Sequence, residues 1–257
     1  MIIDSHCHLD GFFKSGQLDD ILSRAADVGV CHFVTIGTNS EECLINADLA
    51  KKFDQIDYTI GLHPLNVDAI KPDFEQFFLN KNMPCAIGEI GLDYHYLPDS
   101  DDRIEIIEKQ KDIFREQLEC AKLHDLPVTI HSRDAFDDTF EILVNSGIKG
   151  NEILFHCFSY SPREMEILMN FGTYVSFAGN VTYKNASSIR EALKLANKDR
   201  VLLETDCPYL APVPFRGKPN EPAFIQKTAE FISDFLGDDK FIDRAFENTI
   251  RFFGLRL

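Results

Sequence analysis

Two histidines one residue apart end the first apolar run of the chain, in Asp4-Ser5-His6-Cys7-His8. Because side chains alternate between the two faces of a strand, His6 and His8 point the same way. Two imidazoles placed like this are able to hold one metal ion. The pair alone is equally consistent with one core histidine and one surface histidine, so the other strands have to decide.

The same arrangement recurs at four later apolar runs, each of which ends in a residue able to bind a metal: Glu89, His131, His156 and Asp206. In a parallel barrel, residues at the carboxyl ends of the strands converge on one small volume. A carboxylate buried there is costly unless it is paired or bound to a metal. Metal coordination accounts for all six residues together.

Six ligands are too many for one catalytic zinc that keeps an open position. They suit two divalent ions that share a bridging carboxylate, each with room for water. Glu89 lies on a middle strand and is the natural bridge, while Asp206 is placed to ligate an ion and to accept a proton from the attacking water. We therefore expect Glu89 and Asp206 to be catalytic. The histidines suit Zn²⁺, and the oxygen ligands suit Mg²⁺ or Mn²⁺.

Eight short apolar, β-branched runs predict the strands that carry these residues. They lie near residues 2–4, 32–36, 58–61, 85–89, 127–131, 152–156, 173–177 and 201–205. Helical periodicity separates or follows them near residues 17–28, 40–53, 73–80, 103–124, 134–146, 161–171, 186–197, 221–236 and 239–253. Asp134 and Ser161 mark helix starts, and Gly29, Gly147 and Gly172 mark helix ends.

Strands that alternate with helices favour a parallel sheet, and eight is the number that closes a barrel. We predict an α/β fold, a (β/α)₈ TIM barrel, with residues 1–257 forming a single domain. An open, doubly wound sheet is the alternative, because a sequence pattern does not prove closure. The long connection over residues 92–102 is expected to wall the substrate site.

Further polar side chains fall on loops at the same end of the predicted barrel. The substrate-contacting candidates are His63, Arg133, Lys184 and Arg216, with Lys218 beside them. Arg and Lys hold phosphates or carboxylates, although any one of them is equally well explained as surface charge. His95 is at least as well explained as a solvated loop residue, and His32 and His124 are given no role. The aromatic candidates for stacking on bases are Phe12, Phe13, Tyr94 and Tyr96.

Cys7, Cys157 and Cys207 each adjoin a predicted ligand. Strand alternation turns all three thiols away from the metals. We therefore interpret them as small buried hydrophobic residues rather than as nucleophiles.

The composition restricts the class of function. A net charge of −16 repels nucleic acid and anionic membranes at long range, which argues against a DNA-coating role but not against a nuclease that grips a strand end. Seven cysteines without a CxxC pair fit a reducing compartment. With no signal-peptide pattern and no apolar stretch long enough to span a membrane, a cytoplasmic location without membrane contact is expected.

Taken together, the motifs resemble the TatD family of metal-dependent deoxyribonucleases, within the amidohydrolase-like barrels. Three stretches carry the resemblance: residues 2–10 (IIDSHCHLD), 127–135 (PVTIHSRDA) and 202–212 (LLETDCPYLAP). Supporting pieces are GLHP at 61–64, GEIGLDY at 88–94 and RGKPNEP at 216–222. The resemblance extends from about residue 2 to the C-terminus.

The resemblance implies a TIM barrel with the ligands His6, His8, Glu89, His131, His156 and Asp206. It implies Mg²⁺- or Zn²⁺-dependent phosphodiester hydrolysis, often as a 3′-to-5′ exonuclease on single-stranded DNA. It also supports a substrate role for His63, Arg133 and Arg216. Tyr160 replaces a commonly small residue and Phe215 a commonly found histidine; both are expected near the mouth, where they bear on substrate preference.

We thus expect a hydrolase that uses two ions to cleave single-stranded DNA from its 3′ end. The alternative is a hydrolase of an amide, lactone or aminoacyl-tRNA ester, in which the same ions polarise a carbonyl. A binding protein with a relict site is a third possibility, which the presence of all six ligands disfavours.

Overall fold

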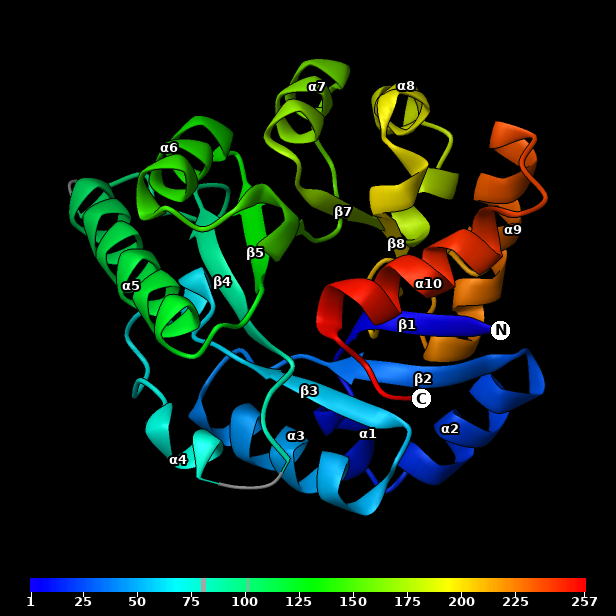
Figure 1. The fold of residues 1–257 in the computed structure, drawn as a ribbon, viewed down its shortest axis with the longest axis horizontal. Helices are drawn as coiled ribbons and strands as arrows, with labels where there is room; N and C mark the ends of the chain where they lie inside the picture. Colours follow the sequence, from blue (N-terminus) through cyan, green and yellow to red (C-terminus); the bar gives the residue numbers. More distant parts are fainter. Residues whose placement is uncertain (80–81, 101) are drawn as a thin grey trace.

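Eight parallel strands form a barrel with helices around its outside in the computed structural model, which describes residues 1–79, 82–100 and 102–257 (Figure 1). The strands neighbour one another in chain order. They are β1 Ile2–Cys7, β2 Val30–Thr35, β3 Ile56–Ile60, β4 Ala86–Asp93, β5 Val128–Arg133, β6 Ile153–Phe155, β7 Tyr174–Phe177 and β8 Val201–Leu203. The predicted TIM barrel is confirmed.

Helices follow the strands and cover the outer face of the sheet (Figure 1). The α-helices are α1 Asp10–Lys14, α2 Leu18–Asp27, α3 Ser40–Lys52, α4 Glu75–Phe78, α5 Arg103–Leu123, α6 Phe136–Ser146, α7 Pro162–Phe171, α8 Ser187–Leu195, α9 Ile225–Leu236 and α10 Phe241–Phe253. Short 3₁₀ turns are η1 Pro64–Asn66, η2 Gly150–Glu152, η3 Gly179–Thr182, η4 Lys198–Arg200 and η5 Pro222–Phe224.

The helix signals of the sequence hold at most ends. Ser161 caps α7 and Glu164 completes the capping box, while Gly147 and Gly172 end α6 and α7 in the left-handed conformation. The expected start at Asp134 is wrong by one residue: Asp134 has a φ of 53°, and Ala135 precedes the helix instead. The helix expected over 73–80 shrinks to the single turn of α4, and residue 80 lies outside the described residues.

Three strands run further than predicted, and this changes which residues they present. β1, expected near residues 2–4, continues to Cys7. β4 continues past Glu89 to Asp93, with an irregular register between Ile87 and Ile90, and β5 continues past His131 to Arg133. The long connection therefore begins after Asp93, and residue 101 within it lies outside the described residues. Asp93 thus becomes a strand residue paired with Arg133.

The ends of β1 and the segment after β8 meet through four hydrogen bonds. Thr205 donates from its backbone N and its Oγ1 to the buried carboxylate of Asp4, at 2.9 and 2.5 Å. Asp206 N donates to His6 O, and His8 N donates to Cys207 O, both at 2.9 Å. These bonds join the first and last strands, exclude the open-sheet alternative, and bring Asp206 beside the two histidines of β1.

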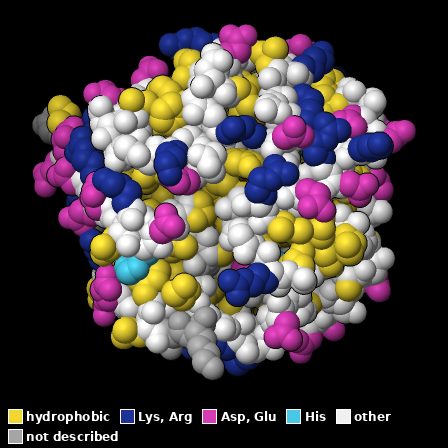
Figure 2. Space-filling model, in the orientation of Figure 1, with side chains coloured by type: hydrophobic (Ala, Val, Ile, Leu, Met, Phe, Trp, Pro, Cys, Tyr) yellow, Lys and Arg dark blue, Asp and Glu magenta, His cyan; other side chains and the backbone are white. Residues whose placement is uncertain are grey.

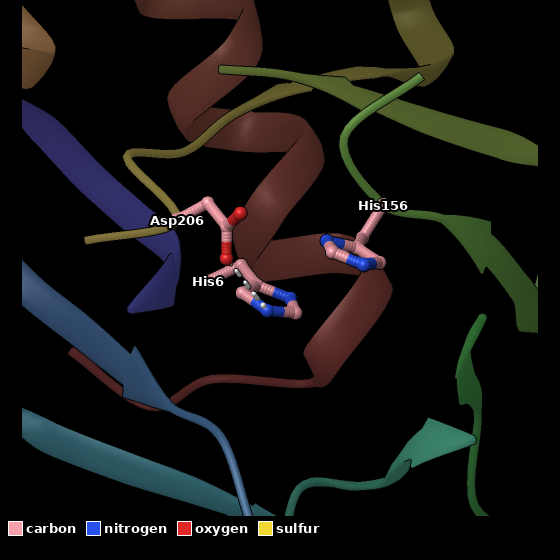
Figure 3. Close-up of side chains that lie close together, drawn as sticks. All are labelled: His6, His156 and Asp206. Atoms are coloured by element: carbon pink, nitrogen blue, oxygen red, sulfur yellow. Dashed lines mark ion pairs between the residues drawn. The ribbon is translucent and has the colours of Figure 1, made fainter. Parts of the chain in front are cut away.

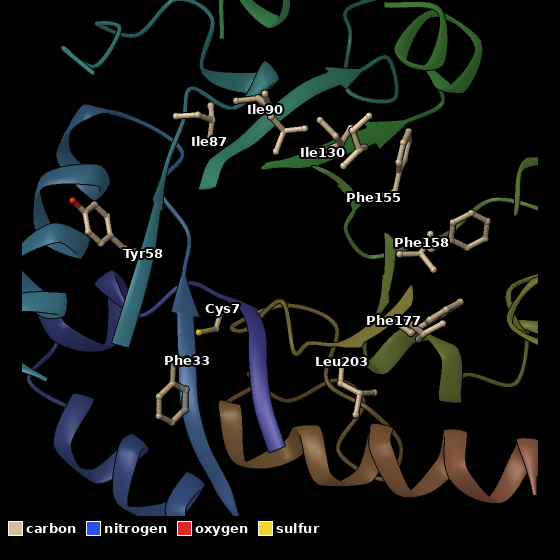
Figure 4. Packing of buried hydrophobic residues seen from close by; sticks show 14 of the residues in the cluster. Cys7, Phe33, Tyr58, Ile87, Ile90, Ile130, Phe155, Phe158, Phe177 and Leu203 are labelled. Carbon is tan, nitrogen blue, oxygen red and sulfur yellow. The ribbon is translucent and has the colours of Figure 1, made fainter. Parts of the chain in front are cut away.

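The larger core lies between the strands and the surrounding helices. Figure 4 shows side chains such as Phe33, Ile130 and Phe177 in this layer, with Cys7 among them. A second cluster includes Leu154 and Leu202, which strand alternation places on the same face as His156 and Glu204. The end of α10 and the residues after it complete this cluster with Phe252, Phe253 and Leu255.

Figure 2 shows the face of the molecule on which α10 lies in Figure 1. Acidic and basic side chains are mixed over this face, and neither sign gathers into one patch. Among the described residues, no helix is both long and apolar enough to cross a membrane.

Shortening a side chain of the second cluster should lower the stability of the protein. Leu202→Ala removes a fully buried side chain and should lower the free energy of unfolding by about 2–5 kcal/mol. Leu195→Ala, in α8 with its side chain half exposed, should cost far less. Urea denaturation followed by circular dichroism compares the two; equal losses would show that Leu202 is not part of a packed core.

Candidate metal centre

Glu89 lies at the centre of a group of histidines from four different strand ends. Its Oε1 is 2.7 Å from His131 Nδ1, 2.8 Å from His156 Nε2 and 3.3 Å from His63 Nε2. Its Oε2 is 3.5 Å from His6 Nε2. The two oxygens of one buried carboxylate therefore face two different sets of imidazole nitrogens.

We call His6 and His8 the first set and His131, His156 and His63 the second set. Asp206 completes the first set. Its Oδ1 lies 3.6 Å from His6 Nε2 and 3.5 Å from His8 Nε2. Figure 3 shows Asp206 and His6 directed toward each other, with the ring of His156 on the other side of His6. The rings of His6 and His156 are stacked at 4.0 Å between centroids, so the two sets are in direct contact.

The donor atoms of these residues lie close enough together to hold a metal ion. His6, His8 and Glu89, as well as His6, His156 and Asp206, place ligand atoms within 4.8 Å of one another. Both ring nitrogens of His6 are buried, and among the described residues neither has a hydrogen-bond partner. Because a buried polar atom without a partner is costly, this histidine is consistent with a ligand whose partner is a cation.

Two further carboxylates stand behind the histidines of the second set. His131 Nε2 is 3.0 Å from Asp93 Oδ2, and His156 Nδ1 is 3.5 Å from Glu204 Oε1. Ser176 donates to the other oxygen of Glu204 at 2.5 Å. A carboxylate on the far nitrogen fixes the tautomer and orientation of a metal-binding histidine. As a result, Nδ1 of His131 and Nε2 of His156 face Glu89.

The protein compensates the buried charge of Glu89 with protons on its neighbours. Burial opposes the charge of Glu89, but the charges of His156 and His63 and the hydrogen bond from His131 hold its pKa well below the usual value. Burial also opposes the charge of His8, but Asp206 outweighs it and raises the pKa of His8 to about 9. The pKa of His156 is raised well above its usual value, because burial is outweighed by Glu89 and Glu204.

An open cavity of about 1090 Å³ lies over this group. Its floor includes His8, Glu89, His131, His156 and Asp206. Its walls come from the loops after several strands and from α1 and the start of α3. A cavity of this size at the carboxyl end of barrel strands is where substrates bind in this fold.

Two of the four predicted substrate residues line this cavity. They are His63 and Arg133, and the Arg133 guanidinium lies over the Tyr96 ring, 4.7 Å from its centroid. Lys184 and Arg216 do not line it; Lys184 is exposed and Arg216 lies over Tyr183 at 4.3 Å.

Of the four predicted aromatic side chains, Phe12 and Tyr96 line the cavity and Phe13 and Tyr94 do not. Tyr94 instead donates to Asp138 at 2.7 Å. His95 is half exposed and pairs with Asp134 at 2.8 Å, as expected of a loop residue.

One cysteine differs from its prediction. Cys7 and Cys207 are buried away from the cavity, as predicted. Cys157 lines the cavity, because β6 ends at Phe155 and a φ of 45° at Cys157 breaks the strand alternation. Burial raises its pKa well above the usual value, so the thiol is not activated as a nucleophile.

The two departures from the family pattern lie outside the cavity lining. Tyr160 shares a 2.8 Å hydrogen bond with Ser132. Ser132 lines the cavity and Tyr160 does not, so Tyr160 supports the cavity wall. Phe215 stacks on Phe224 at 3.9 Å. Both were expected near the mouth; Tyr160 lies behind a residue of the cavity wall, and neither side chain lines the cavity itself.

Several cavity residues were missed in the sequence. Asp93 and Tyr209 carried a detectable signal, since each lies three or four residues beyond a predicted ligand on the same face of the barrel. Asp10 and Glu42 carried none, because their place in the wall depends on how α1 and α3 pack.

A barrel with this cluster at its carboxyl end defines a class of metal-dependent hydrolases, and comparison with known proteins agrees. The sequence model of the family described as "TatD related DNase" matches residues 3–254. The uncharacterized metal-dependent hydrolase YabD of Bacillus subtilis is 37% identical over 239 residues, which cover 91% of both chains. The uncharacterized metal-dependent hydrolase YcfH of Escherichia coli K12 is 35% identical, over 92% of this chain and 88% of its own.

The fold also resembles that of a solved structure. That of YJJV, a TatD homolog from Escherichia coli, superposes with a TM-score of 0.89 at 28% identity, over 99% of this chain and 98% of that one. The chain belongs to the TatD family of metal-dependent hydrolases.

Metal binding should release protons, because ligating imidazoles must be neutral. His8, His131 and His156 have raised pKa values, so they hold protons near neutral pH that an ion has to displace. Apparent affinity for Mn²⁺ or Zn²⁺ should therefore rise steadily from pH 6 to 9, with about one proton or more released per ion.

Calorimetry in two buffers with different ionisation enthalpies counts these protons. His124→Ala, at a histidine beside Glu75 and away from the cavity, should leave the count unchanged. A pH-independent affinity without proton release would contradict the assignment of these histidines as ligands.

Proposed function

We propose that this protein is a two-metal-ion phosphodiesterase that removes nucleotides from the 3′ end of single-stranded DNA. The observation that carries the proposal is the shared carboxylate: Glu89 presents one oxygen to His6 and the other to His131 and His156. Membership of a family described by its DNase activity supports the choice of substrate.

The residues present fit two divalent ions. His6, His8 and Asp206 would hold one, His131 and His156 would hold the other, and Glu89 would bridge them. We propose Mg²⁺, Mn²⁺ or Zn²⁺, since the set mixes imidazoles with carboxylates. When bound, the ions supply positive charge for the oxygens of the reacting phosphate and lower the pKa of water.

The chain's own groups then have defined tasks. Asp206, whose pKa the adjacent histidines hold below its usual value against the effect of burial, accepts the proton of the attacking water. Arg133 and His63, in the cavity wall, contact the phosphate oxygens. A bond forms between the water oxygen and phosphorus, the P–O3′ bond breaks, and the departing oxygen takes up a proton. The products are a 5′-mononucleotide and a shortened strand.

Lys184 and Arg216 have a different proposed task. Because they lie outside the cavity lining, they would meet only those phosphates of a longer strand that have left the cavity. Their contribution is electrostatic and depends on strand length and on salt.

A carbonyl hydrolase of the same barrel class is the second candidate, and one observation favours it. The cavity lining includes five carboxylates, while Arg133 is the single Lys or Arg among its described residues. Turnover of p-nitrophenyl phosphodiesters against p-nitrophenyl esters separates the two. Strong ester hydrolysis without phosphodiester cleavage would eliminate the nuclease.

Loss of either catalytic carboxylate should abolish turnover. Glu89→Ala and Asp206→Ala each leave part of a metal site without its anion, and we expect cleavage rates to fall by at least about 10³-fold while the circular dichroism spectrum is kept. Glu105→Ala removes an exposed carboxylate of α5 and serves as the matched control. Variants at Glu89 or Asp206 that cut as fast as wild type would show the site assignment to be wrong.

Arg133 and Arg216 should respond differently to strand length. On a dinucleotide, Arg133→Ala should lower kcat/KM by about tenfold, whereas Arg216→Ala should have no effect. On a twenty-nucleotide strand, Arg216→Ala should also lower kcat/KM, most clearly at low salt. Equal effects of the two substitutions on the dinucleotide would contradict the placement of Arg216 outside the cavity.

The decisive experiment uses a 5′-labelled single-stranded oligonucleotide, first in EDTA and then with Mg²⁺, Mn²⁺ or Zn²⁺ restored singly. A metal-restored ladder that shortens from the 3′ end supports bond type, substrate and polarity together. Absence of cleavage with every metal, in protein that binds two ions, would transfer the proposal to the carbonyl hydrolase.

A further inference from the structure

Side chains of opposite charge line the two sides of the cavity. Arg133 ends β5 and lies over Tyr96, which follows β4. Asp10 and Glu42 line the cavity near His8, and their ligand atoms and that of His8 lie within 4.8 Å of one another. Asp10 follows β1 and Glu42 lies in α3 after β2, which are four and three strands from β5 in the eight-stranded barrel, so the cation and the two carboxylates lie on opposite sides of the metal centre. We name Asp10 and Glu42 the acidic wall.

The carboxylates of the acidic wall are held in place by neighbouring side chains and backbone groups. Thr38 donates to Glu42 Oε2 from N and Oγ1 at 3.2 and 2.5 Å, and Asn39 Nδ2 donates to Glu42 Oε1 at 2.8 Å. Lys14 Nζ is 3.4 Å from Asp10 but 2.9 Å from Glu41, so one ammonium is divided between two carboxylates.

Helix α3 begins at the acidic wall, and a helix N-terminus commonly attracts a phosphate. Here that position is already filled by the chain itself. Asn39 Oδ1 accepts from Glu42 N at 3.1 Å, and the carboxylate of Glu42 returns to the N–H of Thr38. A phosphate placed there would meet a carboxylate instead of free N–H groups.

An aromatic side chain faces the same end of the cavity. Tyr209 lines it with 62% of its surface exposed, and its ring centroid is 6.0 Å from that of His8. Burial, and then the charges of Asp206, Glu42 and Asp10, raise the pKa of its hydroxyl, which is consistent with carboxylates around it. Exposed aromatic rings of this kind stack on bases.

We propose that the acidic wall and Tyr209 form the subsite for the terminal nucleoside and select strands whose 3′ end is a hydroxyl rather than a phosphate. The inference rests on the proposed nuclease function. With the reacting phosphate at the metal centre, the rest of the strand runs toward Arg133, and the terminal nucleoside lies on the acidic side. Its 3′-hydroxyl donates a hydrogen bond to a carboxylate, whereas a 3′-phosphate would bring a charge of roughly −1.5 to −2 against it.

Three DNA strands of one sequence test this proposal: one with both ends free, one with a 3′-phosphate and one with a 5′-phosphate. The last has the same total charge as the second and is its control. Chromatography of the products measures how fast each is degraded. Wild type should degrade the 3′-phosphate strand at least about tenfold more slowly than the 5′-phosphate strand, because the carboxylates of the acidic wall repel the added phosphate.

Glu42→Gln, which keeps the shape and part of the hydrogen bonding, should reduce this ratio to less than about threefold. Asp10→Asn provides a second variant should Glu42→Gln impair folding. Glu105→Gln, the same change at an exposed position in the first turn of α5, should leave the ratio unchanged.

Equilibrium binding gives a readout independent of turnover. Calorimetry on the metal-loaded protein should show 5′-deoxyadenylate binding more tightly than deoxyadenosine 3′,5′-bisphosphate, and Glu42→Gln should narrow the difference. Equal degradation of the 3′- and 5′-phosphate strands would overturn the inference and leave the nuclease standing. A ratio unchanged in both Glu42→Gln and Asp10→Asn would also overturn it. Failure to degrade any strand would remove the proposed function itself.

Discussion

The buried negative charge of Glu89 is the constraint on which the rest of the site depends. A carboxylate this deeply buried is unstable unless positive charge surrounds it. Imidazoles from the ends of β1, β5 and β6 and from the loop after β3 surround it. Of these, His131 and His156 have raised pKa values and carry the compensating protons. The same requirement propagates outward, since Asp93 and Glu204 compensate the histidines in turn.

The barrel makes this arrangement possible, because several strand ends each contribute one or two side chains to a common point. Closure between β1 and β8 completes the first set of candidate ligands. Asp4 accepts both donors of Thr205, and this connection holds Asp206 opposite His6 and His8. Asp4, a structural carboxylate two residues before His6 on β1, therefore helps to hold the candidate ligand Asp206 in position.

Much of the fold and site was predictable, because each strand is a short apolar run and five of the eight runs end in residues that are able to bind a metal. The eight strands, the helix capped by Ser161 and the convergence of the six candidate ligands followed from that pattern alone. What the pattern could not give depends on backbone irregularity and on helix packing. A left-handed residue placed Cys157 in the cavity, and the path of the loops kept Lys184 and Arg216 out of its lining.

The contact between the two ends of the barrel also has a consequence for biosynthesis. During translation, His6 and His8 are made before the other candidate ligands, and Asp206 follows 200 residues after His6, counting from 6 to 206. Until then β1 lacks its neighbour β8, and the aromatic residues at the end of α10 that complete the second hydrophobic cluster have not been made. A nascent chain thus carries the histidines of the first candidate ligand set without its aspartate, so the complete centre, and any activity it supports, arises only after Asp206 and α10 have been made.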